Sequence, residues 1–132
     1  MSNAQNVFVA YGTIILGVGF ALGIALGALR ASKPSIRNLA TAHVETLMQA
    51  SMHLGLAFAV GAVGFDSGTA TTGAWLLAIG SGMQAIGVTL NWLQNVGDQF
   101  AEKSKGWMIN SASTFVAVPG LVIVMAGILG NL

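Results

Sequence analysis

The 132-residue sequence contains no cysteine and very few charged residues. Without cysteine there can be no disulfide, thiolate metal site, iron–sulfur cluster or cysteine nucleophile. Only 7% of the residues are charged, whereas a soluble domain carries roughly 25%. The formal net charge is +1, so the chain lacks the basic surface that nucleic-acid binding requires. A polar, solvated exterior is therefore excluded, and function is expected within or beside lipid.

Hydrophobic residues make up 55% of the sequence, and the mean hydropathy is +0.77. They gather in four runs, at residues 7–29, 39–64, 71–93 and 107–129. Runs of this length form helices of roughly 35 to 39 Å, enough to cross a hydrocarbon core about 30 Å thick. The sequence therefore predicts an all-α integral membrane protein, a four-transmembrane-helix bundle in a single domain covering residues 1–132.

The basic residues indicate how this bundle is oriented. All five lie in the first and third connections: Arg30, Lys33, Arg37, Lys103 and Lys105. By the positive-inside rule, loops 30–38 and 94–106 are cytoplasmic and both termini lie outside. We expect the protein in a bacterial inner membrane with this orientation.

The first apolar run carries three glycines at four-residue steps, Gly19, Gly23 and Gly27. Such a stripe removes side chains from one face of a helix, so another backbone can approach closely in lipid. Two interpretations are open: the stripe contacts another subunit, or it packs against a helix of the same bundle.

The second apolar run contains two histidines, a glutamate and a glutamine: His43, Glu45, Gln49 and His53. Polar groups at membrane depth are costly and usually indicate function. At about 100° per residue, the last three fall within roughly 80° of one another and form a polar stripe. His43 lies on a different face. The two histidines are therefore not expected to share a zinc ion, because a chelating pair needs a spacing of three or four residues.

A single histidine can still bind the iron of a haem, because the porphyrin supplies the other donors. The simpler interpretation is that each histidine hydrogen-bonds a neighbouring helix. Glu45 can likewise form a salt bridge with Arg37, which lies about two turns before it. The residues alone leave these alternatives open.

The third apolar run has a polar face of its own. Its members recur at spacings of three, seven and four: Ser81, Gln84, Asn91 and Asn95. They lie on one side of the helix, so this face is expected to point into the bundle. Together with the stripe on the second helix, it predicts a substrate pocket open toward the cytoplasmic leaflet. The predicted pocket residues are Gln49, His53, Ser81, Gln84 and Asn91.

From residue 42 to residue 65 the second run reads AHVETLMQASMHLGLAFAVGAVGF. It resembles the second membrane helix of the styrene oxide isomerases, in which an Ala-His pair is followed six residues after the histidine by Asn, and later by Ala-Phe and Gly-Phe. The matching positions, without a gap, are Ala42, His43, Gln49, Ala57, Phe58, Gly64 and Phe65. The runs IILGVGFALG and STFVAVPGLVIVMAGIL are similar to that family's first and fourth helices. The resemblance therefore extends loosely over most of the chain.

The resemblance implies a haem protein with a specific reaction. Styrene oxide isomerases are four-helix membrane proteins that assemble as trimers and bind haem b between subunits through the helix-two histidine, which is His43 here. Their ferric iron acts as a Lewis acid on an epoxide oxygen, and a 1,2-hydride shift then gives a carbonyl compound. For this chain the resemblance implies a homotrimer in a lipid bilayer, haem b held by His43, and isomerisation of a small hydrophobic substrate.

Some pocket positions differ from those of the family. Gln49 replaces the family's Asn and keeps its amide donor on a longer arm. On the third helix, the family's Asp, Asn and Tyr fall at Ser81, Ala85 and Thr89. The resemblance thus implies catalytic roles for Gln49 and Thr89, and it leaves the family's pocket tyrosine without a counterpart at the aligned position.

Two other classes of function also fit the sequence. A proton- or ion-translocating subunit pairs a glycine-rich helix with a membrane carboxylate, which Gly19, Gly23, Gly27 and Glu45 provide. A non-enzymatic oligomeric membrane scaffold fits the composition as well and needs no cofactor.

Overall fold

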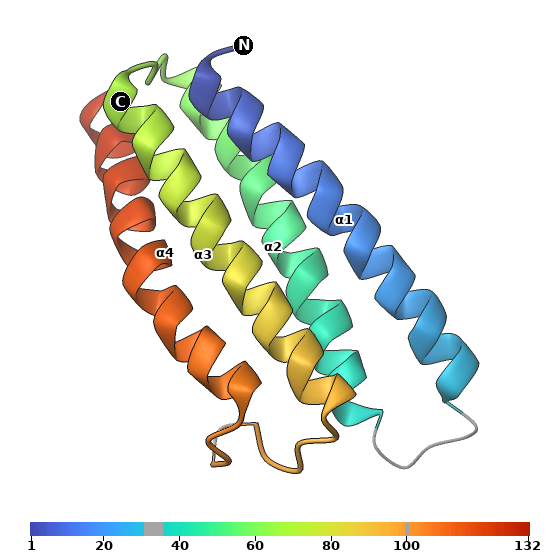
Figure 1. Ribbon diagram of the computed structural model, residues 1–132. Coiled ribbons are helices and arrows are strands. Elements are labelled where there is room, and N and C mark those ends of the chain that lie inside the picture. Colours follow the sequence, from blue (N-terminus) through green and yellow to red (C-terminus); the bar gives the residue numbers. More distant parts are fainter. Residues whose placement is uncertain (31–35, 100) are drawn as a thin grey trace.

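The computed structural model describes residues 1–30, 36–99 and 101–132. Over these ranges the chain forms four α-helices: α1 (Asn3–Leu29), α2 (Arg37–Ala62), α3 (Gly68–Leu93) and α4 (Lys105–Gly130). They run alternately up and down in one antiparallel bundle, with both termini at the same end (Figure 1). The predicted all-α fold is confirmed for the described residues, none of which lies in a strand.

Three of the four helices, α1, α3 and α4, are long and apolar enough to cross a membrane. At 26 residues α2 is as long as α3, but over the described residues it does not reach the same hydropathy. The reason is its polar side chains: Asn38, Thr41, His43, Glu45, Thr46, Gln49, Ser51 and His53. Of the four predicted transmembrane helices, length and composition therefore support three.

Serine side chains define the start of three helices. Ser2 accepts a hydrogen bond from the backbone N–H of Gln5 at 3.2 Å, and the Gln5 side chain accepts one from the Ser2 N–H at 2.8 Å. This reciprocal pair is a capping box. Ser67 and Ser104 cap α3 and α4 by accepting from the backbone in the same way. The caps extend these helices beyond the apolar runs, so α1 begins at Asn3 rather than at residue 7.

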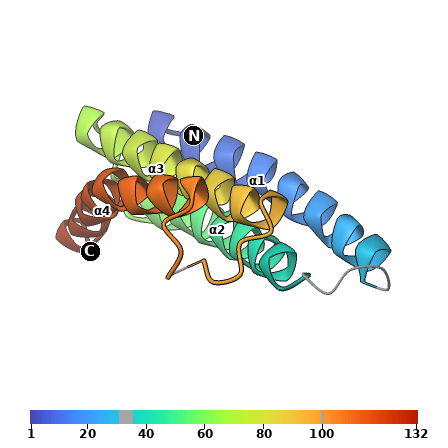
Figure 2. The same ribbon diagram turned by 60° about the horizontal axis from the view of Figure 1, so that its bottom comes forward.

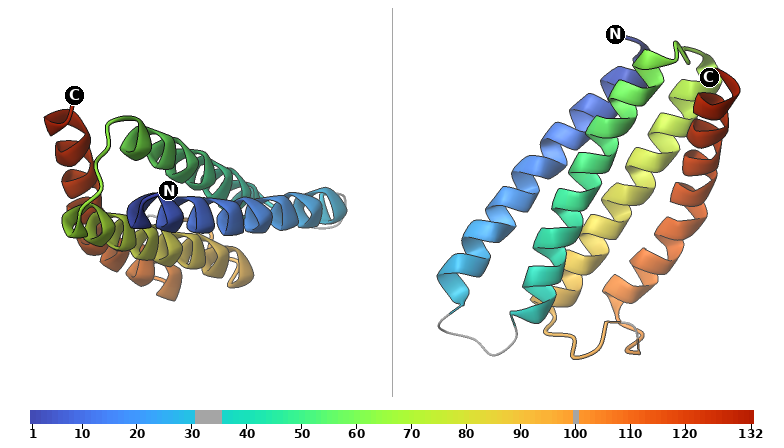
Figure 3. Two further views of the ribbon diagram at one scale, coloured as in Figure 1. Left: turned by 90° about the horizontal axis from the view of Figure 1, so that it is seen from above. Right: turned by 180° about the vertical axis from the view of Figure 1, so that it is seen from behind.

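The bundle consists of two close helix pairs, α1 with α2 and α3 with α4. The helix α3 also packs on α1 and α2, whereas α4 has hardly any contact with α2 (Figure 3). The loop between α3 and α4 lies at the end of the bundle where α2 begins (Figure 2), and there the Asn38 side chain donates to the Val96 carbonyl. A groove lined by residues of α2, α3 and α4 remains on this side of the bundle.

Glycines bring α3 and α4 into backbone contact. On α3, Gly73, Gly80 and Gly87 recur at seven-residue steps and face α4. A Cβ atom added to Gly80 would lie 2.6 Å from the backbone nitrogen of Ala117. This stripe was not among the predicted contacts, because a period of seven does not stand out in a run that is rich in small residues.

The predicted glycine stripe of α1 packs within the same bundle. A Cβ atom added to Gly19 would lie 2.7 Å from Leu47 Cδ2 on α2. One added to Gly23 would lie 2.7 Å from His43 Cε1, also on α2. Gly27 faces open space among the described residues. Of the two interpretations, packing inside the bundle therefore holds for Gly19 and Gly23.

Replacing Gly80 by alanine should destabilise the bundle, because the new methyl group meets the backbone of α4 rather than a movable side chain. We expect a loss of about 1–3 kcal/mol in the free energy of unfolding, measured as a lower melting temperature in detergent. Gly17→Ala is the matched control, since nothing described lies within 4 Å of its added Cβ and alanine favours the helix by about 1 kcal/mol. An equal or higher melting temperature for Gly80→Ala would contradict the backbone contact.

Candidate functional site

His43 lies in the second turn of α2, with its ring against the backbone of α1. Its Nδ1 is 2.7 Å from the carbonyl oxygen of Gly19. Because a carbonyl oxygen only accepts, Nδ1 carries the proton and Nε2 keeps its lone pair. Gly23 makes room for the ring, since an added Cβ there would lie 2.7 Å from Cε1 and 3.1 Å from Nδ1. The main chain of α1 thus fixes both the tautomer and the position of the ring.

The Nε2 atom of His43 has no hydrogen-bond partner within the described residues, and the side chain is half-buried. The neighbouring surface of α1 is apolar. Phe20 and Ile24, which directly follow the two contacting glycines, are 62% and 75% exposed. An imidazole nitrogen with a free lone pair suits a metal whose other donors come from a cofactor.

A second polar cluster lies in the interior, where α1 meets α2. The Tyr11 hydroxyl donates to Gln49 Oε1 at 3.2 Å, and His53 Nδ1 is 2.8 Å from the Gln49 carbonyl oxygen. The rings of Tyr11 and Phe8 contact the His53 imidazole, with centroid distances of 4.4 and 5.7 Å. The Gln49 amide is thereby oriented with its oxygen occupied. Its Nε2 donor is buried and has no partner among the residues that the structure describes.

Gln49 also lines a cavity of about 280 Å³ between α2 and α3. The other lining residues are Glu45, Met48, Met52, Ser81 and Gln84. Three of the five predicted pocket residues, Gln49, Ser81 and Gln84, therefore share one cavity.

The remaining predicted site residues lie elsewhere. His53 is fully buried in the bundle and does not line this cavity. Asn91 accepts a hydrogen bond from the Ser104 hydroxyl at 2.6 Å, which ties the end of α3 to the start of α4. The Thr89 hydroxyl donates to the Ala85 carbonyl of its own helix at 2.7 Å, and it does not line the cavity either.

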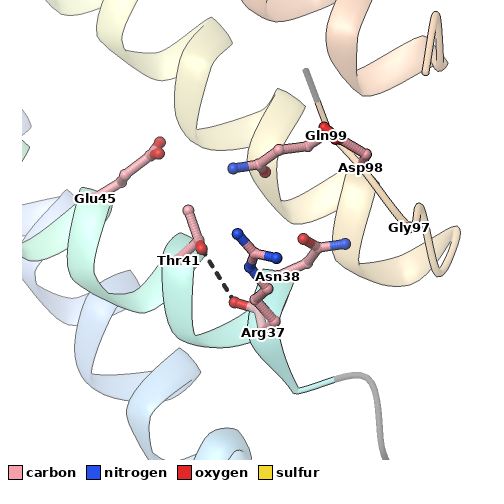
Figure 4. Close-up of a pocket in the computed structure, with 7 residues that line it drawn as sticks. All are labelled: Arg37, Asn38, Thr41, Glu45, Gly97, Asp98 and Gln99. Carbon is pink, nitrogen blue, oxygen red and sulfur yellow. Dashed lines mark hydrogen bonds between the residues drawn. The ribbon is translucent and has the colours of Figure 1, made fainter. Parts of the chain in front are cut away.

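Glu45 forms no salt bridge within the described part of the chain, and its Oε2 is buried without a hydrogen-bond partner. Arg37 lines a neighbouring cavity with Glu45 (Figure 4), but the expected pairing of the two is not formed. The carboxylate is thus held inside the groove with one acceptor oxygen unused.

His43 and Gln49 open onto different spaces. Six residues separate them along α2, which turns one by about 120° from the other. The His43 ring packs on Gly19 and Gly23, and it does not line the cavity that contains Gln49. Among the described residues, the cavity that Gln49 lines therefore does not include the His43 imidazole.

Tyr11 is the candidate residue that sequence reasoning missed. It is the only tyrosine in the chain. A buried hydroxyl normally finds a hydrogen-bond partner, so a lone tyrosine in an apolar run is a signal in itself. The sequence did not name its partner, because that depends on how α1 is placed along α2.

Comparisons of this chain with protein-family models, with curated proteins and with solved structures give no match. The surroundings of His43 and Gln49 are therefore the basis for assigning a function. No group of three or more metal-binding side chains gathers anywhere in ranges 1–30, 36–99 and 101–132. His43 is therefore not part of such a group among the described residues.

Proposed function

We propose that this chain is a haem b-binding membrane protein that isomerises a small hydrophobic epoxide to a carbonyl compound. His43 would hold the haem iron, and Gln49 would bind the substrate oxygen. The protein is a homotrimer of four-transmembrane-helix subunits in a bacterial inner membrane, with both termini outside and loops 30–38 and 94–106 cytoplasmic. Lys33, one of the basic residues behind this orientation, lies outside the described residues.

The contact between His43 Nδ1 and the Gly19 carbonyl oxygen is the observation that carries the proposal. A metal-binding histidine almost always donates its second ring N–H to a carbonyl, a carboxylate or water, which fixes the tautomer that offers the other nitrogen to the metal. The same hydrogen bond here leaves the Nε2 lone pair unused. The residues present therefore fit a porphyrin iron, which needs one imidazole from the protein.

The proposal that α2 also crosses the membrane rests on its length and position. Its 26 residues correspond to roughly 39 Å, and it packs along α1, which is apolar enough to cross. Four of its polar side chains are buried in the bundle: Asn38, Thr46, Gln49 and His53. In a functional helix that crosses a membrane, polar side chains are expected to point into the protein rather than toward the lipid.

The different directions of His43 and Gln49 support an oligomer. Because His43 does not line the cavity around Gln49 among the described residues, a substrate held between iron and amide would need His43 of one subunit and Gln49 of another. The exposed Phe20 and Ile24 give α1 a surface that a second subunit can cover. The number of three subunits comes from the family resemblance.

Ferric haem, when bound, supplies a Lewis acid for the epoxide oxygen. Gln49 Nε2 can donate a hydrogen bond to that oxygen, and Tyr11 holds the amide in this orientation by donating to Oε1. Met48 and Met52 give the cavity an apolar wall, which keeps water from the cation that forms as the carbon–oxygen bond opens. A 1,2-hydride shift within the substrate then gives the carbonyl compound without net oxidation or reduction.

The contacts of α1 give less support to the two other functions. In a translocating subunit the glycine-rich helix would lie beside the carboxylate, but Gly19 and Gly23 contact Leu47 and His43 rather than Glu45. A non-enzymatic scaffold has no need of a histidine with a fixed tautomer and a free lone pair. We therefore rank both below the haem protein.

The test of the proposal is the visible absorption spectrum of the protein purified in detergent from cells supplied with ample haem. A haem protein gives a red sample with a Soret band, and it should isomerise aromatic or terpene-like epoxides. A colourless and inactive sample would contradict the proposal and favour the scaffold. Proton flux into liposomes that Glu45→Gln abolishes would favour the translocating subunit.

Replacing Gln49 by alanine should leave the Soret band intact and lower epoxide turnover by about a hundredfold, because a hydrogen bond to the developing oxyanion is lost. Turnover is measured as carbonyl product formed per bound haem. Gln94→Ala is the matched control, since Gln94 is exposed at the end of α3 and should keep full activity. Unchanged turnover in Gln49→Ala would show that the amide does not act on the substrate.

A further inference from the structure

Glu45 lies where three cavities of the groove between α2 and the α3–α4 pair come together. The loop cavity, of about 280 Å³, is bounded by the first turns of α2 and by the loop after α3 (Figure 4). The α4 cavity, of about 270 Å³, includes Trp107 and Ser111. The third is the cavity around Gln49. All three are lined by Glu45, so the groove is continuous at this residue.

Three buried acceptor oxygens without a hydrogen-bond partner among the described residues belong to this groove, and one of them is Asn110 Oδ1 in the α4 cavity. The other two are Glu45 Oε2 and Gln99 Oε1. Both residues line the loop cavity and the α4 cavity. Figure 4 shows the Gln99 side chain extending from the loop toward α2. Because buried acceptors are normally paired, the groove is matched to a ligand that donates hydrogen bonds.

The charge of the groove favours a cation. Glu45 places its carboxylate where the three cavities meet, and Arg37 is the one basic residue among the described residues that lines them. Glu45 has no counter-ion within the described ranges. Trp107 lines the α4 cavity, and the face of an indole ring attracts an ammonium group.

The size of the groove favours an organic cation over a metal ion. A water molecule takes up about 30 Å³ of the liquid, so each cavity is several times larger than one ion or one water needs. Apolar side chains also line it: Val88 in the α4 cavity, and Met48 and Met52 in the cavity around Gln49. A matching ligand has an ammonium head and a hydrocarbon body.

We infer that the groove binds the primary ammonium group of an amphiphile, which donates to Glu45 Oε2 and Gln99 Oε1 while its hydrocarbon part extends toward Met48 and Met52. This binding goes beyond the haem function and does not require haem, but its hydrocarbon part would occupy the cavity that the proposed function assigns to the epoxide. An aminophospholipid and a free alkylamine share this chemistry. The lipid also carries a phosphate, and Arg37 in the loop cavity can bind it.

The test compares octylammonium with octanol, which has the same chain without the charge, on the purified protein. Tryptophan fluorescence, to which Trp107 contributes, gives the dissociation constants. Octylammonium should bind the wild type roughly tenfold more tightly than octanol, and Glu45→Gln should weaken octylammonium by roughly tenfold, because a charge-assisted hydrogen bond becomes a neutral one. Asp66→Asn, an exposed carboxylate at the other end of the bundle, is the matched control and should change neither constant.

Native mass spectrometry after exposure to phosphatidylethanolamine and phosphatidylcholine shows whether the ammonium group belongs to an aminophospholipid or to a free alkylamine. Retention of phosphatidylethanolamine that both Glu45→Gln and Arg37→Gln abolish identifies the lipid. Octylammonium binding that Arg37→Gln leaves unchanged, with no lipid preference, identifies a free amine.

Equal affinity of the wild type for octanol and octylammonium overturns the inference, and so does an unchanged constant in Glu45→Gln. The comparison of the two ligands needs no variant, so it decides the matter even if Glu45→Gln does not fold. Neither result bears on the Soret band, which tests the haem function separately.

Discussion

The variant His43→Ala should purify as a colourless protein, with the Soret band of the wild type lost completely. His43 supplies the only nitrogen that the proposal assigns to the iron, and its hydrogen bond to Gly19 leaves the Nε2 lone pair for that purpose. Removal of the imidazole therefore removes the protein's direct bond to the metal. The measurement is the ratio of Soret absorbance to protein absorbance after purification with excess haem.

His53→Ala is the matched control on the same helix. His53 is fully buried against Phe8 and Tyr11, so no haem can reach it. This variant should keep the Soret band and lose about 1–3 kcal/mol of stability, because buried polar groups lose a partner. Added imidazole should restore the band to His43→Ala by taking the place of the missing ring. A Soret band of full intensity in His43→Ala without added imidazole would show that His43 does not bind the iron.

The variant Gly23→Val should lower haem affinity by about tenfold to a hundredfold, as changes in the groups that orient a metal ligand commonly do. Even the first added carbon would lie 2.7 Å from His43 Cε1, and valine adds two methyl groups beyond it. The His43 ring must then move away from the Gly19 carbonyl. The hydrogen bond that fixes its tautomer and its orientation is broken. The measurement is a haem titration of protein purified without the cofactor.

Gly27→Val is the matched control for this variant. It makes the same change one turn later on α1, where nothing described lies within 4 Å of an added Cβ. Haem affinity should stay at the wild-type level there. If Gly23→Val binds haem as well as Gly27→Val does, the ring is not held by α1 in the way the contact indicates.

Hydropathy is enough to predict these helices, because each apolar run continues for the length of a membrane. It does not define where they start, since the starts depend on single capping residues such as Ser2 and Ser104. The length of its apolar run also makes α2 look equivalent to the other three helices. The polar residues that make α2 interesting are the ones that lower its hydropathy below that of its neighbours.

The candidate site was predictable in its chemistry but not in its contacts. Helical periodicity places His43 and Gln49 on different faces, which agrees with their separate surroundings. Which residues of α1 meet them depends on how far α1 is shifted along α2. Close packing at Gly19 and Gly23 sets that shift, and no local pattern in the sequence encodes it. For this reason Tyr11 could not be assigned to Gln49 in advance.

Asn91 and Asn95 show how periodicity misleads at a helix end. Both belong to the polar face that was expected to line the pocket. Asn95 has a φ of 52°, and the Val96 N–H bonds the Asn91 carbonyl at 3.0 Å, which closes α3 with a Schellman motif. Polar residues there serve the turn, and spacing alone does not distinguish them from residues facing a cavity.

Part of the family resemblance has a purely structural explanation. Gly64 has a φ of 67°, a conformation that favours glycine, and the Phe65 N–H bonds the Val60 carbonyl at 3.1 Å to end α2. Any helix that ends in this way favours glycine at this position and an apolar residue directly after it. The functional weight of the resemblance therefore rests on His43 and Gln49, which helix termination does not explain.

The partner of the His43 imidazole is a peptide carbonyl rather than a side chain. Since every amino acid contributes such a carbonyl, no substitution at position 19 can delete the acceptor, and mutation can only obstruct access to it. This contact therefore constrains only a few positions during evolution. They are the histidine on α2 and the two small residues, one turn apart, on α1. Remote relatives should be recognised by that three-residue constellation long after percentage identity has faded.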